Sequence, residues 1–374
     1  MNRENAPFAT SYIRVPASLT RSLSAGPGLM LAGLALLALA AFMLSLAVGS
    51  VRIPLDEIVA VLLGGDASKS AWATIVLKFR LPKALTAMLA GAALSVSGLQ
   101  MQTLFRNPLA GPFVLGISSG ASLGVALTVL LAGVAVGLGG STTLLAGISL
   151  AGDTSLALSA IVGSGLVLLL VMSVARRVQS GMTLLILGLM FGYTTSALVS
   201  VLIYFSVVER IQAYISWTFG SFGGVTWRQL QVMAPAILLG LAGAHLLMKP
   251  LNALLLGETY ALSLGLNVRR VRLGIIGTAA ILAGVVTAFC GPIGFLGIAV
   301  PHLCRSLLNT SDHRLLLPAV SFMGATLALG ADIVAGLPGS QLTLPLNAVT
   351  ALLGAPVVIW VILRQRNLRQ AFAG

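Results

Sequence analysis

Side chains that could do chemistry are few in this sequence, and their spacing suits it poorly. His302 and Cys304 stand two residues apart, as metal ligands often do, but the neighbouring sequence offers no third or fourth ligand. Segment 64–70 (GGDASKS) resembles a phosphate-binding loop, yet it lacks the second glycine before its lysine. Three scattered histidines form no convergent set with carboxylates and serines. We therefore predict no catalytic residues, no metal site and no cofactor.

The composition indicates that much of the surface faces lipid. Of 374 residues, 57% are hydrophobic and 8% are charged, whereas soluble domains carry about 25% charged residues. The 42 glycines suit helices that pack closely in a bilayer, where the hydrophobic drive to associate is absent. The net charge of +13 comes from short clusters between apolar runs rather than from one basic face. We therefore predict no nucleic-acid partner.

Ten apolar runs are long enough to cross a bilayer as helices, at about 20 residues per crossing. We predict an all-α, polytopic membrane protein with a cytoplasmic N-terminal segment (1–28), a single transmembrane domain (29–364) and a cytoplasmic tail (365–374). The run at 142–152 is too short to span, and we expect a surface or re-entrant helix there. The expected spans are Leu29–Val48, Ala84–Phe105, Val114–Leu131, Leu156–Val174, Leu184–Val207, Leu230–Met248, Leu273–Ala288, Ile293–Leu308, Leu315–Ala335 and Leu346–Leu363.

Lysines and arginines predict the orientation. With ten spans both termini share a side, and that side holds 15 of the 22 basic residues, leaving seven on the other. Basic residues concentrate in cytoplasmic loops, so we place both termini in the cytoplasm. Five of the seven exceptions lie between Arg52 and Lys83. That outer stretch is either misplaced or built to meet something acidic.

The longest cytoplasmic connection, 250–272, has apolar residues at helical spacing interrupted by Gly257 and Gly265. This pattern favours two short helices lying flat under the membrane rather than a span. Two interpretations remain open for it. It is an interfacial amphipathic segment or a docking surface for a cytoplasmic partner.

Polar residues within the spans are candidates for a translocation path. Gln100 and Gln102 lie in an apolar run, where polar groups are costly unless they pair or face a cavity. Helix packing and path lining explain them equally well. Glycines at 116, 120 and 124 share a helix face, which favours tight packing, although Ser118 and Ser119 could line a path there. The other path candidates are Asn107, Thr194 and Thr195.

Two similar strings, 111–117 (GPFVLGI) and 291–298 (GPIGFLGI), follow spans of opposite direction. They are predicted on opposite membrane faces, as in an inverted repeat.

Eight sequence blocks carry a family resemblance by their order and spacing. They are 80–83 (RLPK) with 91–98 (GAALSVSG), 106–110 (RNPLA), 115–121 (LGISSGA), 220–228 (GSFGGVTWR), 256–258 (LGE) through 264–265 (LG), 294–305 (GFLGIAVPHLCR), 312–314 (DHR) and 353–356 (LGAP). From about Arg80 to its end, the chain resembles the permease family of ferric-siderophore, haem and cobalamin ABC importers.

This resemblance implies a bacterial inner-membrane homodimer with about ten helices per subunit. Two separate ATPase subunits would lie below it and a periplasmic binding protein above it. Because the chain has no nucleotide-binding motif, ATP would be hydrolysed only on the partner subunits. The cargo would be a bulky chelate, a ferric siderophore before haem or cobalamin. The path would run along the dimer axis, lined largely by the fifth span.

The resemblance also implies roles for individual residues. Arg80 and Lys83 would be exposed charges that dock the binding protein. Many relatives carry a basic residue soon after the Ala331–Asp332 pair, but none follows here until Arg364, so docking on that side would use other groups. The residues implied in coupling to the ATPase are Gly257, Glu258, Ala261, Leu264 and Gly265.

Two other classes of protein fit less well. A secondary transporter or channel would favour ionisable residues inside its spans, and Asp332 is the nearest case here. A membrane-embedded enzyme would need a convergent set of catalytic side chains, which this sequence does not supply.

Overall fold

The structure, a computed structural model, describes residues 26–137, 153–177, 181–337 and 342–371. Within these ranges every regular element is a helix, which confirms the all-α prediction. The helix predicted at 142–152 lies outside the described residues.

Ten apolar helices match the ten expected spans in order. Seven are long and apolar enough to cross a membrane, and the other three contribute shorter apolar stretches, 117–130, 296–308 and 346–360. The ten are α1 (Pro27–Ala47), α4 (Leu81–Leu104), α5 (Ile117–Gly137), α7 (Asp153–Ala175), α8 (Gly181–Tyr204), α10 (Trp227–Leu246), α13 (Val268–Cys290), α14 (Leu296–Leu308), α15 (His313–Ala335) and α16 (Leu346–Ala371).

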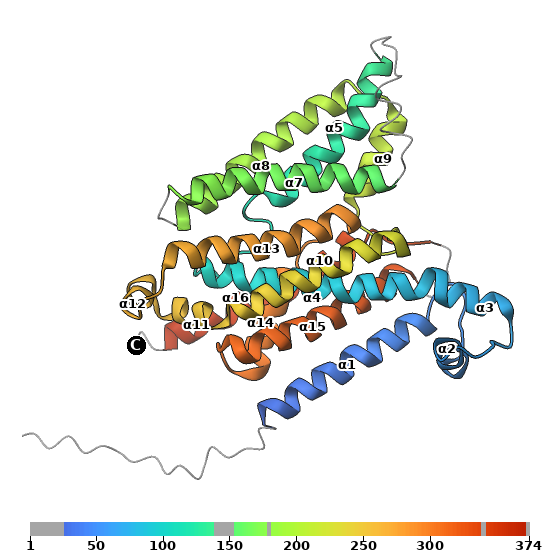
Figure 1. Cartoon of the computed structure of the whole chain (residues 1–374), viewed down its shortest axis with the longest axis horizontal. Coiled ribbons are helices and arrows are strands. Elements are labelled where there is room, and N and C mark those ends of the chain that lie inside the picture. The colour runs from blue at the N-terminus through green and yellow to red at the C-terminus, as the bar shows by residue number, and fades with distance from the viewer. Residues whose placement is uncertain (1–25, 138–152, 178–180, 338–341, 372–374) are drawn as a thin grey trace, which may run out of the picture.

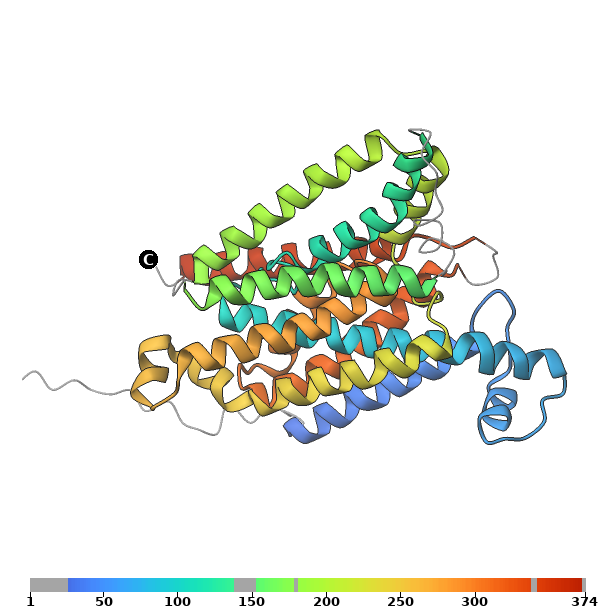
Figure 2. The same cartoon turned by 45° about the horizontal axis from the view of Figure 1, so that its top comes forward.

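Short helices gather at the two ends of this bundle (Figures 1 and 2). One end, the α2 end, carries α2 (Leu55–Leu62), α3 (Ser70–Thr74) and the π-helix η1 (Ile75–Arg80). The opposite end, the α12 end, carries α11 (Met248–Leu256) and α12 (Glu258–Ser263). A further short helix, α9 (Val208–Thr218), follows α8 and packs on α5.

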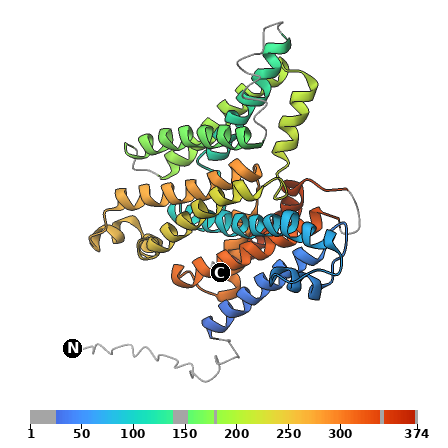
Figure 3. The same ribbon diagram turned by 45° about the vertical axis from the view of Figure 1, so that its right-hand side comes forward.

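The second span is longer than the sequence predicts. It is expected to begin near Ala84, but α3, η1 and α4 form one helical stretch of 35 residues, Ser70–Leu104. About 20 residues suffice to cross the hydrocarbon core. The first turns therefore project from the bundle beside α2, as Figure 3 shows.

Helix α4 is the centre of the bundle, and glycines allow its neighbours to approach. It packs against α1, α10, α13, α14 and α15. A Cβ atom on Gly98 would overlap the carbonyl oxygen of Gly297 in α14, and one on Gly91 would overlap that of Gly324 in α15. Close backbone approach of this kind replaces side-chain burial as the source of packing energy in lipid.

The glycine series beside α5 packs in the same way. A Cβ on Gly120 would lie 2.6 Å from the carbonyl oxygen of Gly163 in α7, and one on Gly116 would lie 3.2 Å from that of Gly188 in α8. The tight packing predicted from the glycine spacing is therefore confirmed.

The two similar strings begin at opposite ends of the bundle, because α4 and α13 run in opposite directions (Figure 1). The non-helical segment that follows α4 meets the first turn of α14, the helix that follows α13. A Cβ on Gly111 would lie 3.1 Å from Cγ1 of Ile298, and a Cβ on Gly297 would lie 2.5 Å from Cδ of Pro112. Interrupted segments that meet inside a bundle are typical of transporters with inverted repeats. The repeat itself stays a prediction.

Candidate functional site

The first candidate site is the pair of short helices at the α12 end. The stretch 250–272 forms α11, α12 and the first turn of α13, so the two predicted helices are confirmed. Gly257 links them with φ 122° and ψ 153°. Gly265 follows α12 with φ 78°. Residues with a Cβ rarely adopt either conformation, which explains glycine at both turns.

The predicted coupling residues differ in exposure. Glu258, Leu264 and Gly265 are exposed, whereas Gly257 and Ala261 are buried. Several large apolar side chains around them face outward and form an exposed apolar patch at this end of the bundle. These side chains are Leu256, Tyr260, Leu262 and Leu264.

An ion pair ties α12 to the bundle, and a hydrogen bond ties α11 to it. Nη2 of Arg272, on α13, lies 2.7 Å from Oε1 of Glu258. Nη2 of Arg106, in the segment after α4, donates to the carbonyl of Leu254 at 3.3 Å. Both short helices are therefore held by side chains from spanning helices or their ends.

A polar network behind α11 joins it to α4 and α15. The side-chain oxygen of Asn252 accepts from the backbone N–H of His313 at 2.9 Å, and its amide nitrogen donates to Oδ1 of Asp312 at 2.6 Å. Nε2 of His313 lies 2.9 Å from Oγ1 of Thr103. The sequence singled out 312–314 only as one block of the resemblance, because nothing in the spacing shows that Asn252 and Thr103 lie beside it.

Asp312 also caps α15. Its carboxylate accepts from the backbone N–H of Arg314 at 2.9 Å. That bond, together with the amide of Asn252, lowers the pKa of Asp312. A carboxyl whose pKa is lowered by folding stabilises the fold above its unfolded value, about 3.9. That stabilisation is lost as the pH falls through the folded value.

We expect Asp312→Ala to destabilise the protein by about 0.5–2 kcal/mol, the usual cost of losing an N-cap. The difference from the parent protein should begin to shrink as the pH falls below about 4, where the carboxylate of the unfolded chain becomes protonated, and should be lost only below the lowered pKa of the folded carboxylate. Thermal unfolding in detergent across pH measures both effects. Asp312→Asn is the control, because asparagine keeps a capping oxygen without the titration. A stability difference between Asp312→Ala and the parent protein that stays constant at acidic pH would contradict the capping role.

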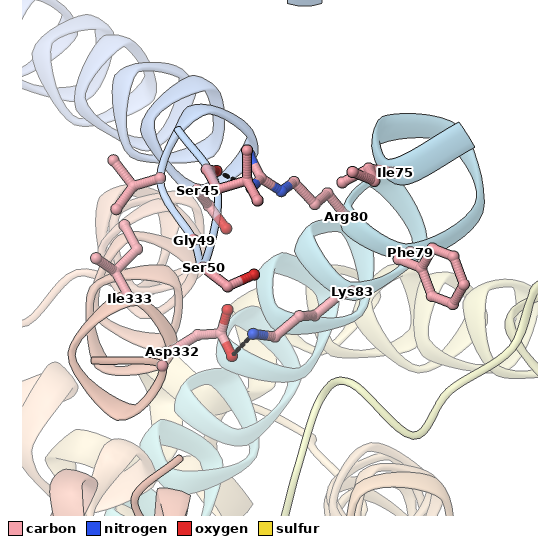
Figure 4. A pocket seen from close by; sticks show the side chains of 12 residues that line it. Ser45, Gly49, Ser50, Ile75, Phe79, Arg80, Lys83, Asp332 and Ile333 are labelled. Carbon is pink, nitrogen blue, oxygen red and sulfur yellow. Dashed lines mark hydrogen bonds and ion pairs between the residues drawn. The ribbon is translucent and has the colours of Figure 1, made fainter. Parts of the chain in front are cut away.

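The second candidate site lies at the α2 end, around Lys83 and Asp332 (Figure 4). Nζ of Lys83, on α4, is 3.0 Å from Oδ1 of Asp332, on α15. The side chain of Lys83 is 35% exposed and that of Asp332 is 8% exposed. The pair forms part of the wall of a cavity of about 330 Å³, which Arg80 also lines.

Arg80 has structural partners as well. Its Nη1 donates to the carbonyls of Leu46 at 2.7 Å and Ala47 at 3.1 Å, and its Nη2 donates to that of Val51. A cation at the C-terminal end of α1 is favoured by the helix dipole. The expectation that Arg80 and Lys83 are exposed charges is therefore wrong, since both are partly buried and engaged within the chain. Docking by them stays a prediction.

The two glutamines of α4 are buried inside the subunit. Nε2 of Gln100 donates to Oγ1 of Thr278 at 2.9 Å. Gln102 accepts from Arg305 at 2.6 Å and donates to the carbonyl of Ile298 at 3.2 Å. This geometry favours helix packing over path lining for both residues.

The remaining path candidates differ in position. Thr194 is exposed on α8, whereas Thr195 is buried. Ser118 and Ser119 are partly buried on α5, and Asn107 receives the N–H of Leu109 at 2.9 Å in the turn after α4. Thr194 alone of these five lies openly on the subunit surface, so it is the candidate best placed to face a path between two subunits.

The two residues first considered as metal ligands have other surroundings. Nε2 of His302 lies 2.7 Å from the carbonyl oxygen of Pro108, and Cys304 is fully buried in the apolar core. No group of three histidine, cysteine or carboxylate side chains gathers among the described residues.

Helix number, interrupted segments and short end helices together define a polytopic membrane transport protein. Residues 36–364 match the FecCD transport family, and the chain belongs to that family. It is 41% identical to the vitamin B12 import system permease protein BtuC of Klebsiella pneumoniae over 90% of this chain and 93% of that protein. It is 38% identical to BtuC of Shigella boydii over 89% and 94%.

Solved structures agree with this assignment. The fold is similar to that of a metal-chelate type ABC transporter in an inward-facing conformation, with a TM-score of 0.76 and 30% sequence identity. The match covers 90% of this chain and 99% of that one. It confirms the expected permease fold.

Proposed function

We propose that this chain is the permease subunit of an ATP-driven importer that carries a bulky metal chelate from the periplasm to the cytoplasm. The observation that carries the proposal is the full-length similarity to vitamin B12 import permeases, 41% over 90% of the chain. The likeness to a metal-chelate type ABC transporter supports the same class.

Cobalamin is the first cargo to test. The family resemblance makes a ferric siderophore the first expectation and leaves haem and cobalamin open, but both relatives described above are vitamin B12 permeases. All three cargoes are large and partly polar, so a path with few specific side chains suits each of them.

In the proposed assembly two copies pack around the path with α8 between them. This helix has the lowest buried share of the seven long apolar helices, 17%. Its surface mixes apolar side chains with Tyr193 and the hydroxyl of Thr194, both exposed. A helix that faced lipid alone would gain nothing from such groups.

The two ends of the bundle would meet different partners. The α12 end would lie in the cytoplasm with both termini and bind two ATPase subunits through its exposed apolar side chains. The α2 end would face the periplasm of a bacterial inner membrane and receive the substrate-binding protein. The basic-residue bias supports this orientation.

A secondary transporter without an ATPase is the weaker alternative. Such a protein would need ionisable groups inside its spans for ion coupling. Among the described residues, the seven candidate membrane spans, which in α7 begin at Ser155, contain one carboxylate, Asp332, and it is paired with Lys83.

Uptake in reconstituted vesicles tests the proposal. Vesicles holding this chain, the ATPase and the binding protein should accumulate radiolabelled cobalamin only with ATP. The purified chain alone should hydrolyse no ATP. Accumulation driven by an ion gradient without the ATPase would refute the importer and support the alternative. A panel with ferric siderophores and haem would reassign the cargo if cobalamin fails.

We expect Lys83→Gln to weaken binding of the substrate-binding protein up to about fivefold at low salt, because an exposed ion pair is worth about 0.2–1 kcal/mol. Asp332→Asn should keep or raise affinity, since it frees Lys83 for the partner. Lys69→Gln, an exposed lysine at the same end, is the matched control. Affinity measured at two salt concentrations distinguishes these cases, and an unchanged Lys83→Gln affinity at low salt would leave Lys83 as a structural residue.

A further inference from the structure

A pocket at the α12 end is lined by arginines from the ends of two spanning helices, α7 and α13. Its volume is about 290 Å³. Four of its eight lining residues are arginines and one is a carboxylate. The lining residues are Ala175, Arg176, Arg177, Glu258, Leu262, Val268, Arg269 and Arg272.

The pocket carries an excess of positive charge. Arg272 is paired with Glu258 at 2.7 Å. Within the described part of the chain no carboxylate lies within ion-pair distance of Arg176, Arg177 or Arg269. Guanidinium groups converging on one concavity repel each other unless an anion lies between them. Their planar forks suit the oxygens of a phosphate.

The pocket also lies at the level of a lipid headgroup. The apolar window of α7 ends at Ala175, and α13 begins at Val268, so the rim coincides with the ends of two spans. Arg176 continues the helix, because its N–H donates to the carbonyl of Met172. Basic pockets between helices on the cytoplasmic side are known to hold anionic headgroups.

An apolar track leads along α7 to the arginines. Val162, Leu166 and Leu169 are 61%, 63% and 66% exposed. These three residues are spaced by four and three positions, and Arg176 comes seven positions after Leu169. At these spacings all four residues share one face of the helix. This arrangement offers acyl chains a surface directly beside a site for their phosphate.

We propose that this pocket binds the phosphate headgroup of an anionic membrane lipid, held by Arg176, Arg177 and Arg269. The lipid would bridge the end of α7 and α12, because Glu258 of α12 lines the same pocket. Anionic lipid would thereby steady the region proposed for ATPase coupling. The binding itself does not depend on the proposed transport function.

The experiment is native mass spectrometry of the purified full chain titrated with cardiolipin, phosphatidylglycerol and phosphatidylcholine. We expect retention of the two anionic lipids and little of the zwitterionic one. Each basic residue near a lipid headgroup contributes roughly fivefold in affinity. The double variant Arg176→Gln/Arg269→Gln should therefore weaken retention on the order of 30-fold.

The matched control is Arg270→Gln/Arg314→Gln, which removes two exposed arginines at the same end that do not line the pocket. It should retain lipid like the parent protein. Equal loss in the two double variants would overturn the site, because it would indicate non-specific attraction. Inorganic phosphate that displaces the lipid at comparable concentration would show a soluble-anion site instead. Unchanged lipid retention with loss of ATPase association would assign the arginines to the protein partner.

Discussion

Replacing Gly98 with leucine is expected to prevent the chain from accumulating as a folded membrane protein. A Cβ atom alone at this position would overlap the carbonyl oxygen of Gly297. The obstacle is backbone from another helix, so no rotamer change relieves it, and α4 would have to separate from α14. Overpacking a well-packed core costs about 1–3 kcal/mol, and a backbone clash at the central helix belongs at the top of that range or above it.

Membrane abundance and the monodisperse fraction after detergent extraction measure this effect. Gly277→Leu, in the spanning helix α13, is the matched control because nothing lies within 4 Å of a Cβ built there. The Gly98→Ala variant should fall between the parent and the leucine variant. A Gly98→Leu protein that accumulates and migrates like the parent would mean that α4 and α14 do not cross here.

Elements that depend on local pattern could be predicted from the sequence. The apolar runs predict ten helices, and the glycines at 116, 120 and 124 predict the close packing beside α5. Gly257 and Gly265 delimit the two short helices because each occupies a backbone conformation that other residues avoid. In each case the feature depends on residues that lie within one turn or one helix of each other in the sequence.

Partners that come from distant helices could not be predicted in this way. The pairing of Lys83 with Asp332 depends on the register between α4 and α15, and that of Gln102 with Arg305 depends on α14. A single sequence carries no signal of either register. For this reason Arg80 and Lys83 were expected as exposed charges, although the structure gives them partners within the chain.

Helix ends could also not be predicted well from the sequence where no helix-breaking residue is present. The start of α4 was expected at Ala84, yet helical structure continues back to Ser70 through a π-helical turn. Pro82 did not mark a boundary, because proline is tolerated in the first turn of a helix and η1 accommodates it. Conversely, the eighth span was expected from Ile293, but α14 begins at Leu296, after Phe295 at φ 65°.

Gly265→Leu is expected to reduce ATP-driven uptake at least tenfold while the protein still accumulates in the membrane. Gly265 has φ 78°, and a Cβ there would meet no atom within 4 Å. The substitution therefore creates no clash and costs only the strain of a left-handed residue, about 1–2 kcal/mol. The chain can relieve that strain by shifting α12, which carries Glu258 and the exposed apolar side chains proposed to meet the ATPase.

The matched control is Gly64→Leu, at the α2 end, where the glycine has φ 83° and equally open surroundings. It should suffer the same local strain and keep normal ATPase association, since no ATPase contact is proposed there. Uptake into vesicles and co-purification of the ATPase would be measured for both variants at equal membrane abundance. Full uptake by Gly265→Leu with normal ATPase association would remove α12 from the coupling surface. Equal losses of ATPase association in the two variants would trace the defect to general strain, because their positions share only a backbone conformation and lie at opposite ends of the bundle.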